Sequence, residues 1–279
     1  MKNKAKPFLR WAGGKRWLIK NLDNFLPEKF NNYHEPFLGG GAIFFHLKSN
    51  NLIEGDSFLS DLNEELINAY KQVKQNPKEI ISSLKNLKTT KEAYYEARSL
   101  ILTTSYARAL RFIYLNKTSY NGLYRVNSKG KYNVPYGNRK VKNLFGYENI
   151  LNVSKILNQN VYLDSKDFYS VIDNVKEKDL VFLDPPYVID SKNNGFVEYN
   201  QETFTWKDQE KLFQLIKEID QKGAYYILTN IAHLNVKNLF SEIGFMHQIQ
   251  RNSNIGGKGA KRMKINEYIF TNTNNHGNK

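Results

Sequence analysis

The stretch Asp184-Pro185-Pro186-Tyr187 combines a carboxylate, two prolines and an aromatic ring directly after the apolar run 180–183. Such a run is typical of a short buried strand. Proline has no N–H to donate, so the carbonyl oxygens of this turn are left as acceptors. A planar base with an exocyclic amino group needs acceptors for its N–H bonds and a ring on which to stack. The tetrapeptide can supply both, although an ordinary proline turn has the same composition.

A glycine-rich segment, Glu35-Pro36-Phe37-Leu38-Gly39-Gly40-Gly41, begins at the end of a predicted strand over 33–36 and precedes a predicted helix over 42–48. Glycines at such a position let the backbone approach a ligand closely. A dinucleotide fingerprint needs a further glycine where the chain has Phe44, which disfavours a nicotinamide cofactor. Asp61 ends the next predicted strand, where a carboxylate can accept hydrogen bonds from ribose hydroxyls. The alternative for Asp61 is a purely structural role before a helix.

Two weaker candidate segments could contact the same kind of nucleoside-containing cofactor. Trp11-Ala12-Gly13-Gly14-Lys15 departs from a phosphate-binding loop, because Leu9 and Arg16 stand where glycine and serine or threonine are required. It still offers the cation of Lys15, which could hold the carboxylate of an amino-acid moiety. Asp164-Ser165-Lys166-Asp167-Phe168 follows another predicted strand, and there Phe168 could stack on an adenine while Asp167 accepts from its amino group.

The charge of the chain favours a polyanionic partner. Its 41 basic residues exceed its 27 acidic ones and give a net charge of +14, which is typical of proteins that bind nucleic acid. Many of the basic residues are interleaved with aromatic ones, as in proteins that contact phosphates and stack on bases. The glycine-rich basic segment 251–264, which includes Arg251 and Lys258, is a candidate phosphate clamp, with a solvated loop as the alternative.

Composition excludes several other chemistries. The chain has no cysteine, so it has no disulfide, zinc–thiolate site, iron–sulfur cluster or cysteine nucleophile. Its five histidines show no metal-ligand spacing, and we predict no metal site. No apolar run approaches the roughly 20 residues of a membrane span. The basic N-terminus is not followed by an apolar signal core, so we predict no secretion signal.

The positions of the predicted elements indicate an α/β fold into which a second module is inserted. Strands are predicted at 57–60, 161–163, 180–183 and 224–228, and helices at 16–26, 64–73 and 208–221. Alternation of this kind predicts a parallel sheet. Between them, 77–87, 91–100 and 106–116 are predicted helices, and 123–126 with 131–134 form a predicted β-hairpin around Asn127-Ser128-Lys129-Gly130. We therefore predict a discontinuous catalytic domain over 1–70 and 158–271, a recognition domain over 71–157 and a disordered tail over 272–279.

Taken in order, the motifs resemble the Dam-like DNA adenine-N6 methyltransferases (D12 class, alpha type), and they span residues 8 to about 270. The matching stretches are Phe8-Leu9-Arg10-Trp11-Ala12-Gly13-Gly14-Lys15, Glu35-Pro36-Phe37-Leu38-Gly39-Gly40-Gly41, Ser60-Asp61-Leu62-Asn63, Tyr120-Asn121-Gly122-Leu123-Tyr124-Arg125, Asn133-Val134-Pro135-Tyr136-Gly137, Asp184-Pro185-Pro186-Tyr187 and Phe204-Thr205. The resemblance implies a Rossmann-like domain that binds S-adenosylmethionine and releases S-adenosylhomocysteine, with an inserted, mainly helical DNA-recognition domain that carries the hairpin.

The resemblance also implies roles for individual residues. The catalytic motif is Asp184-Pro185-Pro186-Tyr187, in which Tyr187 stacks on the flipped base. The residues that match cofactor contacts are Trp11, Lys15, Phe37, Gly39, Gly41, Asp61, Asp167, Phe168 and Asp184. Those that match DNA contacts are Arg10, Tyr120, Asn121, Leu123, Arg125, Pro135, Asn138, Arg139 and Lys258. Among these, Arg125 resembles the guanine reader, Leu123 and Pro135 the groups that touch thymine methyls, Tyr120 the wedge in the opened duplex, and Arg10 a contact to a flanking guanine.

One departure bears on the recognition sequence. Family members that methylate GATC often have a basic residue directly after Asn133-Val134-Pro135-Tyr136-Gly137, whereas this chain has Asn138 before Arg139 and Lys140. GATC is the site we expect, with a different site as an alternative. The residues also leave open a cytosine-N4 or RNA adenine methyltransferase, and a DNA-binding protein without cofactor activity. The expected partner is double-stranded DNA, for a cytoplasmic monomer of bacterial, archaeal or phage origin, alone or paired with a restriction endonuclease.

Overall fold

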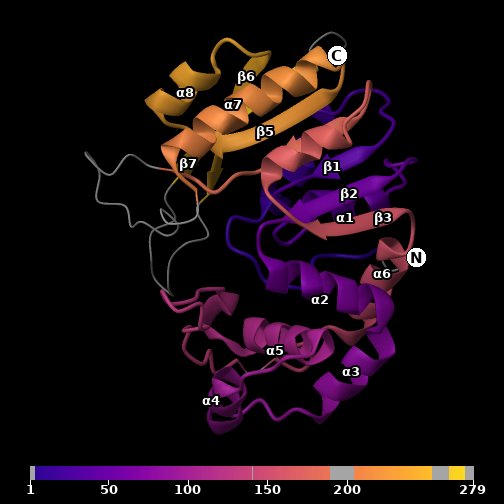
Figure 1. The fold of residues 1–279 in the computed structure, drawn as a ribbon, viewed down its shortest axis with the longest axis vertical. Coiled ribbons are helices and arrows are strands. Elements are labelled where there is room, and N and C mark those ends of the chain that lie inside the picture. Colours follow the sequence, from indigo (N-terminus) through magenta and orange to yellow (C-terminus); the bar gives the residue numbers. More distant parts are fainter. Residues whose placement is uncertain (1–3, 140, 189–203, 253–263, 274–279) are drawn as a thin grey trace. The chain divides into compact units, whose positions relative to one another are not determined.

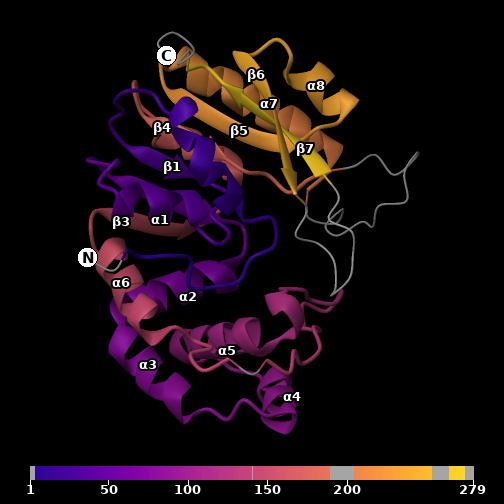
Figure 2. The ribbon, with the colours of Figure 1, turned by 180° about the vertical axis from the view of Figure 1, so that it is seen from behind.

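The computed structural model describes residues 4–139, 141–188, 204–252 and 264–273. The chain, drawn as a ribbon in Figures 1 and 2, divides into two compact units. Unit 1 consists of Met1–Arg16 and Leu38–Lys166, and unit 2 consists of Trp17–Phe37 and Asp167–Lys279. Within the described residues there are seven strands, and helices alternate with most of them, so the predicted α/β class is confirmed. The predicted division into a catalytic and a recognition domain stays a prediction.

Unit 1 contains a parallel strand pair and most of the helices. The strands are β2 (Ser57–Asp61) and β3 (Val161–Ser165), paired in parallel over their whole length. The helices are α1 (Ala42–Ser49), α2 (Glu64–Gln75), α3 (Pro77–Asn86), α4 (Lys91–Ser99), α5 (Ser105–Thr118) and α6 (Tyr147–Leu157), with the short 3-10 helix η2 (Tyr120–Gly122). Helix α5 packs against α2, α3 and α4 (Figure 1).

Helix α2 forms where the sequence predicts it, for local reasons. Asn63 is its N-cap, and the Asn63 side chain accepts a hydrogen bond from the Leu66 N–H at 3.0 Å. Two acidic residues follow in the first turn, where the helix dipole favours negative charge. The apolar face of the helix is buried and includes Leu66, Ile67, Tyr70 and Val73. The cap therefore fixes α2 directly after the end of β2.

Unit 2 contains five strands in the order β1-β4-β5-β7-β6. They are β1 (Tyr33–Glu35), β4 (Leu180–Leu183), β5 (Tyr225–Ile231), β6 (Phe245–Asn252) and β7 (Lys264–Thr271). Strands β1, β4 and β5 are parallel, whereas β7 is antiparallel to both β5 and β6. The expectation of a purely parallel sheet is therefore incomplete, because β6 and β7 were not predicted. The helical segments are η1 (Lys15–Asn24), η3 (Phe168–Asp173), α7 (Trp206–Gln221) and α8 (Leu234–Phe240), although η1 begins at the last residues of unit 1.

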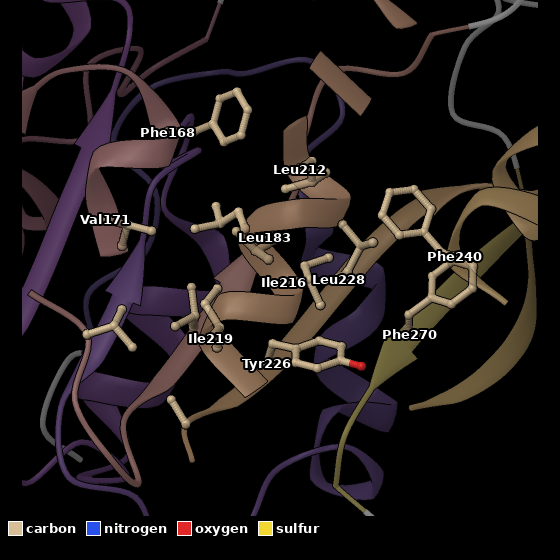
Figure 3. Packing of buried hydrophobic residues seen from close by; sticks show 14 of the residues in the cluster. Phe168, Val171, Leu183, Leu212, Ile216, Ile219, Tyr226, Leu228, Phe240 and Phe270 are labelled. Carbon is tan, nitrogen blue, oxygen red and sulfur yellow. The ribbon is translucent and has the colours of Figure 1, made fainter. Parts of the chain in front are cut away.

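The core of unit 2 lies between α7 and the strands. Helix α7 presents Leu212, Ile216 and Ile219 at a helical spacing, and all three are completely buried. They pack against Leu183 at the end of β4 and against further apolar side chains (Figure 3). Figures 1 and 2 show α7 and α8 on one face of β5, β6 and β7. This packing fixes the end of β4, after which Asp184 follows.

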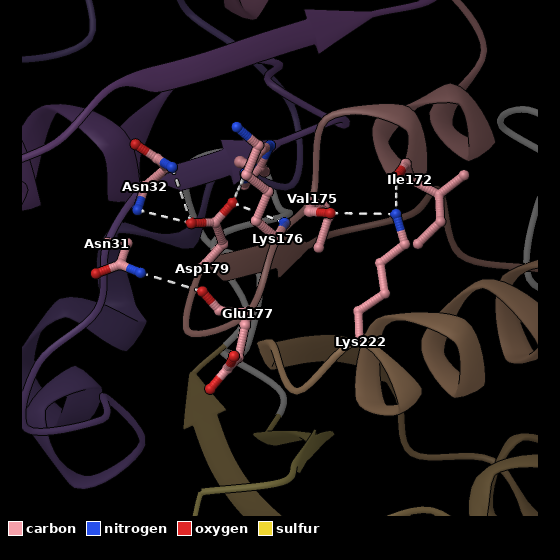
Figure 4. A network of polar contacts seen from close by, with 9 residues as sticks. Asn31, Asn32, Ile172, Val175, Lys176, Glu177, Asp179 and Lys222 are labelled. Atoms are coloured by element: carbon pink, nitrogen blue, oxygen red, sulfur yellow. Dashed lines mark hydrogen bonds and ion pairs between the residues drawn. The ribbon is translucent and has the colours of Figure 1, made fainter.

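A buried polar network holds the amino ends of β1 and β4 (Figure 4). Asp179 directly precedes β4, and its Oδ2 lies 2.9 Å from Nε2 of His34 in β1. Its Oδ1 accepts hydrogen bonds from the N–H and the side-chain amide of Asn32, at 3.0 and 2.9 Å. Burial acts to raise the pKa of Asp179, but the hydrogen bonds from His34, Lys176 and Asn32 outweigh burial and lower it. The network aligns the two strands from their starts.

The predicted hairpin in the insert is a turn rather than a strand pair. Val126 and Tyr132 form an isolated antiparallel bridge, and no named strand covers 123–134. The Asn127 N–H donates to Lys131 O at 2.9 Å, and the Asn133 N–H donates to Arg125 O at 3.0 Å. The reversal of the chain is therefore confirmed, but its pairing is too short to count as β-structure. We refer to residues 123–134 as the recognition turn, after the role that the resemblance implies for them.

Candidate active site

In unit 1, the glycine loop is built around the Asp61 carboxylate. Asp61 Oδ2 accepts a hydrogen bond from the Gly39 N–H, and Oδ1 accepts one from the Asn63 N–H, both at 2.9 Å. On the other side of the loop, the buried Tyr70 hydroxyl donates to Gly39 O at 3.1 Å. Burial raises the pKa of Asp61, although the two backbone N–H groups oppose that rise. The carboxylate is therefore oriented by one backbone N–H that precedes β2 in the chain and one that follows it.

The same loop leaves no room for side chains at its glycines. Gly39 and Gly41 have φ of 47° and 65°, which non-glycine residues rarely adopt. A Cβ at Gly39 would lie 2.8 Å from Cδ1 of Trp11, and one at Gly40 would lie 3.2 Å from Cβ of Trp11. Trp11 in turn stacks on Tyr124 of the recognition turn, with ring centroids 5.7 Å apart and planes at 21°. Trp11 therefore contacts both the glycine loop and the recognition turn.

Lys15 is buried rather than solvated. It is only 3% exposed, and its Nζ donates a hydrogen bond to Gly13 O at 3.0 Å. Because the bond joins two residues of one short segment, it closes the turn that begins at Trp11. Five of the predicted cofactor contacts lie together in unit 1. They are Trp11, Lys15, Gly39, Gly41 and Asp61.

In unit 2, Asp184 and Tyr187 are each held by a side chain from a later strand. The Thr229 hydroxyl in β5 donates to Asp184 Oδ1 at 2.9 Å. The Tyr187 hydroxyl donates to Glu267 Oε2 in β7 at 2.6 Å. Of the two prolines between them, Pro185 is buried and Pro186 is half-buried. The tetrapeptide is therefore anchored at its first and last residues, by partners that sequence reasoning missed because no motif marks Thr229 or Glu267.

An ion pair lies behind this anchor. Arg251 Nε donates to Glu267 Oε1, and the Arg251 guanidinium lies over the Trp17 ring at 5.7 Å from its centroid. The assignment of Arg251 to an exposed phosphate-binding loop is therefore wrong, because Arg251 belongs to β6 and its side chain is only 16% exposed. Lys258 and the other basic residues of 253–263 lie outside the described residues.

The two predicted contacts to the cofactor adenine, Asp167 and Phe168, lie at an aromatic cluster in unit 2. Phe168 is 6% exposed and stacks on Phe37 with centroids 5.1 Å apart. Phe204 packs against both rings. Asp167 caps η3 by accepting from the Tyr169 N–H at 3.0 Å, and it pairs with Lys211 Nζ at 2.7 Å. Most of the Phe168 surface is thus already covered by the chain itself, and Figure 3 shows it beside the apolar core.

Most of the predicted DNA-contact residues lie around the recognition turn of unit 1. Tyr120, Asn121, Arg125, Pro135 and Asn138 are exposed. Leu123, Arg139 and Arg10 are partly exposed. The Tyr120 N–H donates to Pro135 O at 2.9 Å, which ties the two predicted base-contacting segments together. Asn116 in α5 links Arg10 to this group, because it accepts from the Arg10 N–H at 2.8 Å and donates to Gly122 O at 3.3 Å.

The Arg125 side chain is held at Nε, which leaves its terminal nitrogens available for a ligand. Its Nε donates to Asn133 Oδ1 at 2.7 Å, across the recognition turn. Within the described part of the chain, its terminal nitrogens form no hydrogen bond or ion pair. A guanidinium held at Nε keeps both terminal amino groups for a planar acceptor pair, such as O6 and N7 of guanine. The geometry therefore suits the role that the resemblance implies.

Positive charge is concentrated beside the same surface. Burial and the neighbouring charges of Arg139 and Arg10 lower the pKa of Lys117 in α5 to about 8. Burial, and to a smaller extent the nearby Arg139, also lowers the pKa of Arg10. Three like charges held close together repel one another, and a polyanion would relieve this repulsion. Such a cluster is expected next to the phosphates of a bound duplex.

Comparisons with known proteins place the chain in one family. The family model described as "D12 class N6 adenine-specific DNA methyltransferase" matches residues 11–255. The chain is 37% identical to the type II methyltransferase M1.LlaDCHI of Lactococcus lactis subsp. cremoris, over 98% of both chains. It is 35% identical to the type II methyltransferase M.MjaIII of Methanocaldococcus jannaschii, over 92% of this chain and 95% of that protein. It is 28% identical to the DNA adenine methylase of Escherichia coli K12, over 95% of both chains.

Membrane-spanning helices and clustered metal ligands are both absent from the described residues. Among the helices of that part of the chain, none is long and apolar enough to cross a membrane. In the same residues, no three histidine, aspartate or glutamate side chains are grouped so that they could hold a metal ion. The motifs, the α/β fold and the family match agree with one another. The chain therefore belongs to the D12 class of N6 adenine-specific DNA methyltransferases.

Proposed function

We propose that this enzyme methylates N6 of an adenine that has been flipped out of duplex DNA at a specific site, with GATC as that site. The observation that carries the proposal is the anchoring of Asp184-Pro185-Pro186-Tyr187 at both ends by Thr229 and Glu267. A turn held in this way presents acceptors and a ring in fixed positions, as recognition of a planar amine requires.

The residues of the chain fit S-adenosylmethionine as the methyl donor. A carboxylate has about four acceptor positions, and Asp61 uses two of them for backbone N–H groups. The remaining positions can accept the two ribose hydroxyls. Gly39 and Gly41 allow the tight loop whose backbone holds the Asp61 carboxylate. We propose Phe37, Asp167 and the exposed edge of Phe168 as the contacts to the rest of the cofactor. When bound, the cofactor supplies an electrophilic methyl group on a sulfonium.

The chain's own part in the reaction is to orient the target amine. The lone pair of N6 is delocalised into the adenine ring, which makes the amine a poor nucleophile. Hydrogen bonds from the amino group to the Asp184 carboxylate and to the Pro185 carbonyl favour a tetrahedral nitrogen and localise its lone pair. Thr229 fixes the direction of the Asp184 carboxylate. Positioning of this kind can supply several kcal/mol, up to roughly 7–11 in the best intramolecular reactions.

Tyr187 offsets part of the cost of base flipping. Removing a base from the helix costs a few kcal/mol, and stacking on an aromatic ring recovers part of that cost. At the duplex, Arg125 reads a guanine, Leu123 and Pro135 contact thymine methyls, and Tyr120 occupies the opened helix. Arg10, Asn121, Asn138 and Arg139 contact flanking bases and phosphates, and Lys258 does so from outside the described residues.

The cellular setting that we propose follows from the relatives. Two of them are named type II methyltransferases, so the enzyme is proposed to act in the cytoplasm beside a restriction endonuclease. The alternative is an enzyme that acts alone. We propose a monomer, which light scattering of the protein with and without a duplex would test.

The decisive experiment measures methyl transfer from labelled S-adenosylmethionine to two duplexes that differ only in a GATC sequence. The product nucleoside is then identified by mass spectrometry. N6-methyladenine in the GATC duplex alone would support reaction, base and site together. N6-methyladenine in genomic DNA but in neither duplex would retain the reaction and reject the site. DNA binding without any methylated base would favour a DNA-binding protein without cofactor activity.

A further inference from the structure

Glu267 is a charged residue at a position where charge is costly. Its side chain is completely buried in β7, opposite Ile231 of β5 and Ile249 of β6. A buried carboxylate costs several kcal/mol unless it is paired and hydrogen-bonded. Apolar residues flank it on both neighbouring strands, so packing alone would favour an apolar side chain here. The charge therefore calls for a reason beyond the stability of the sheet.

The contacts of Glu267 divide between its two oxygens. Oε1 accepts from Arg251 Nε, and Oε2 accepts from the Tyr187 hydroxyl at 2.6 Å. Arg251 is itself held over the Trp17 ring and is only 16% exposed. A carboxylate fixed at one oxygen by a held guanidinium presents its other oxygen in a fixed direction. That direction is where the Tyr187 hydroxyl lies.

The hydroxyl contact constrains the ring of Tyr187 at its far end. The two side-chain torsions of a tyrosine leave its ring free to swing when only the Cβ end is held. A hydrogen bond at the hydroxyl holds the opposite end and fixes the plane of the ring. Burial and the nearby carboxylates of Asp184 and Glu267 raise the pKa of Tyr187 well above its ordinary value. The hydroxyl therefore stays protonated and remains a donor.

We propose that Glu267 is a positioning residue for methyl transfer, which holds the Tyr187 ring in the plane that the target adenine stacks on, with Arg251 as its counter-ion. The proposal rests on the proposed function, in which Tyr187 stacks on that base. The competing interpretation is a buried ion pair that only stabilises the β6–β7 pair. The two interpretations differ in whether the Tyr187 hydroxyl affects the rate of methyl transfer.

The test compares Tyr187→Phe, Glu267→Gln and the double variant in single-turnover methylation of a duplex that the wild type methylates. Tyr187→Phe keeps the stacking ring and the ion pair and removes only the hydroxyl. We expect it to lower the methyl-transfer rate about tenfold, the upper range for one hydrogen bond, with little change in DNA affinity. We expect Glu267→Gln to lower the rate at least as much, because it also removes the charge that pairs with Arg251. The double variant should be no slower than Glu267→Gln, because the contact to the Tyr187 hydroxyl is already changed in that single variant.

A matched control separates positioning from stability. The Tyr33 hydroxyl also donates to a buried carboxylate, Glu35 Oε2 at 2.8 Å, in β1 of the same unit. Tyr33→Phe should lower the melting temperature and leave the methyl-transfer rate of the folded protein unchanged. A second readout is 2-aminopurine at the target position, whose emission is quenched by ordered stacking. It should be brighter with Tyr187→Phe than with wild type or Tyr33→Phe.

The outcomes are distinct. Tyr187→Phe with wild-type rate and wild-type emission would overturn the role of Glu267 and leave methylation itself intact. Independent, multiplicative rate losses in the two single variants would overturn it as well. A wild-type protein that methylates no adenine in any duplex or in genomic DNA would overturn the proposed function, and the role of Glu267 with it.

Discussion

Two aspartates at the carboxyl ends of strands, Asp61 in unit 1 and Asp184 in unit 2, are held in different ways. Asp61 accepts hydrogen bonds from two backbone N–H groups, one of which is only two residues away. Asp184 is held by the hydroxyl of Thr229, a side chain 45 residues later in the chain. Backbone groups persist when side chains change, whereas the Thr229 contact depends on one residue. We therefore expect a fixed binding geometry at Asp61 and a geometry at Asp184 that substitution can tune.

The largest effect is expected from Asp184→Ala. It removes the carboxylate that accepts from the target amine, so we expect at least about a hundredfold loss of methyl transfer, as for other preorganised polar groups at reacting atoms. Folding should be nearly unaffected, because Asp184 is only partly buried. Single-turnover methylation and thermal unfolding check the two statements. Thr229→Val is the milder companion variant, and it should lie between wild type and Asp184→Ala. Normal turnover by Asp184→Ala would reject the mechanism.

The rigidity of the Asp61 region is tested by Gly39→Ala against Gly13→Ala. Both glycines have positive φ, but an added Cβ would meet Trp11 at 2.8 Å at Gly39 and nothing within 4 Å at Gly13. Both variants lose about 1 kcal/mol to the left-handed backbone, and Gly39→Ala should lose a further ~1–3 kcal/mol from overpacking. Urea denaturation measures the difference, and calorimetry with S-adenosylmethionine should show weaker binding for Gly39→Ala. Equal losses in the two variants would mean that Trp11 moves aside freely.

Arg125→Ala tests whether discrimination between DNA sequences can be lost without a change at Asp61 or Asp184. A lost bidentate guanine contact should cost about 1–3 kcal/mol of discrimination between the correct and a substituted guanine position. The turn itself should persist, because its backbone hydrogen bonds do not involve the Arg125 side chain. Methylation rates on a panel of single-base variants measure the loss. Lys129→Ala, at the exposed tip of the same turn, should weaken binding by a similar factor on every sequence. An unchanged preference in Arg125→Ala would reject its role as a base reader.

The smallest effect is expected from Asn63→Ala, which separates the two functions of Asn63. The side-chain cap of α2 is lost, at about 1 kcal/mol of stability, while the backbone N–H that holds Asp61 is retained. Denaturation should therefore show the loss, and cofactor affinity should stay within about twofold. Thr90→Ala removes the equivalent cap of α4 and is the control for capping alone. A large loss of cofactor affinity would show that the Asn63 side chain also supports the Asp61 site.

Local features of the fold could be predicted from the sequence. The strand over 180–183, the helix over 64–73 and the glycine loop each depend on neighbouring residues, and the structure confirms them. Strands β6 and β7 were missed because the glycine- and lysine-rich segment between them resembles a loop and hides their pairing. Helix α6 was missed as well. The segment predicted as a helix over 16–26 is 3-10 rather than α-helical.

Contacts between distant side chains could not be predicted. The Thr229 hydroxyl reaches Asp184 only because β4 and β5 pair with Leu183 opposite Leu228. Glu267 reaches Tyr187 only through the register of β7, and Arg251 reaches Glu267 only through that of β6. A single sequence contains no measure of strand register across such separations. The family itself could be identified because motif order, unlike register, is visible in the chain.

The position of Trp11 makes it an intrinsic optical probe. Its indole lies against the glycine loop on one side and stacks on Tyr124, next to Arg125, on the other. The chain has three tryptophans, so replacing Trp17 and Trp206 with phenylalanine leaves Trp11 as a lone fluorophore. Stopped-flow records of its emission, with cofactor and DNA added in either order, would time the two binding events from a single ring without any attached dye.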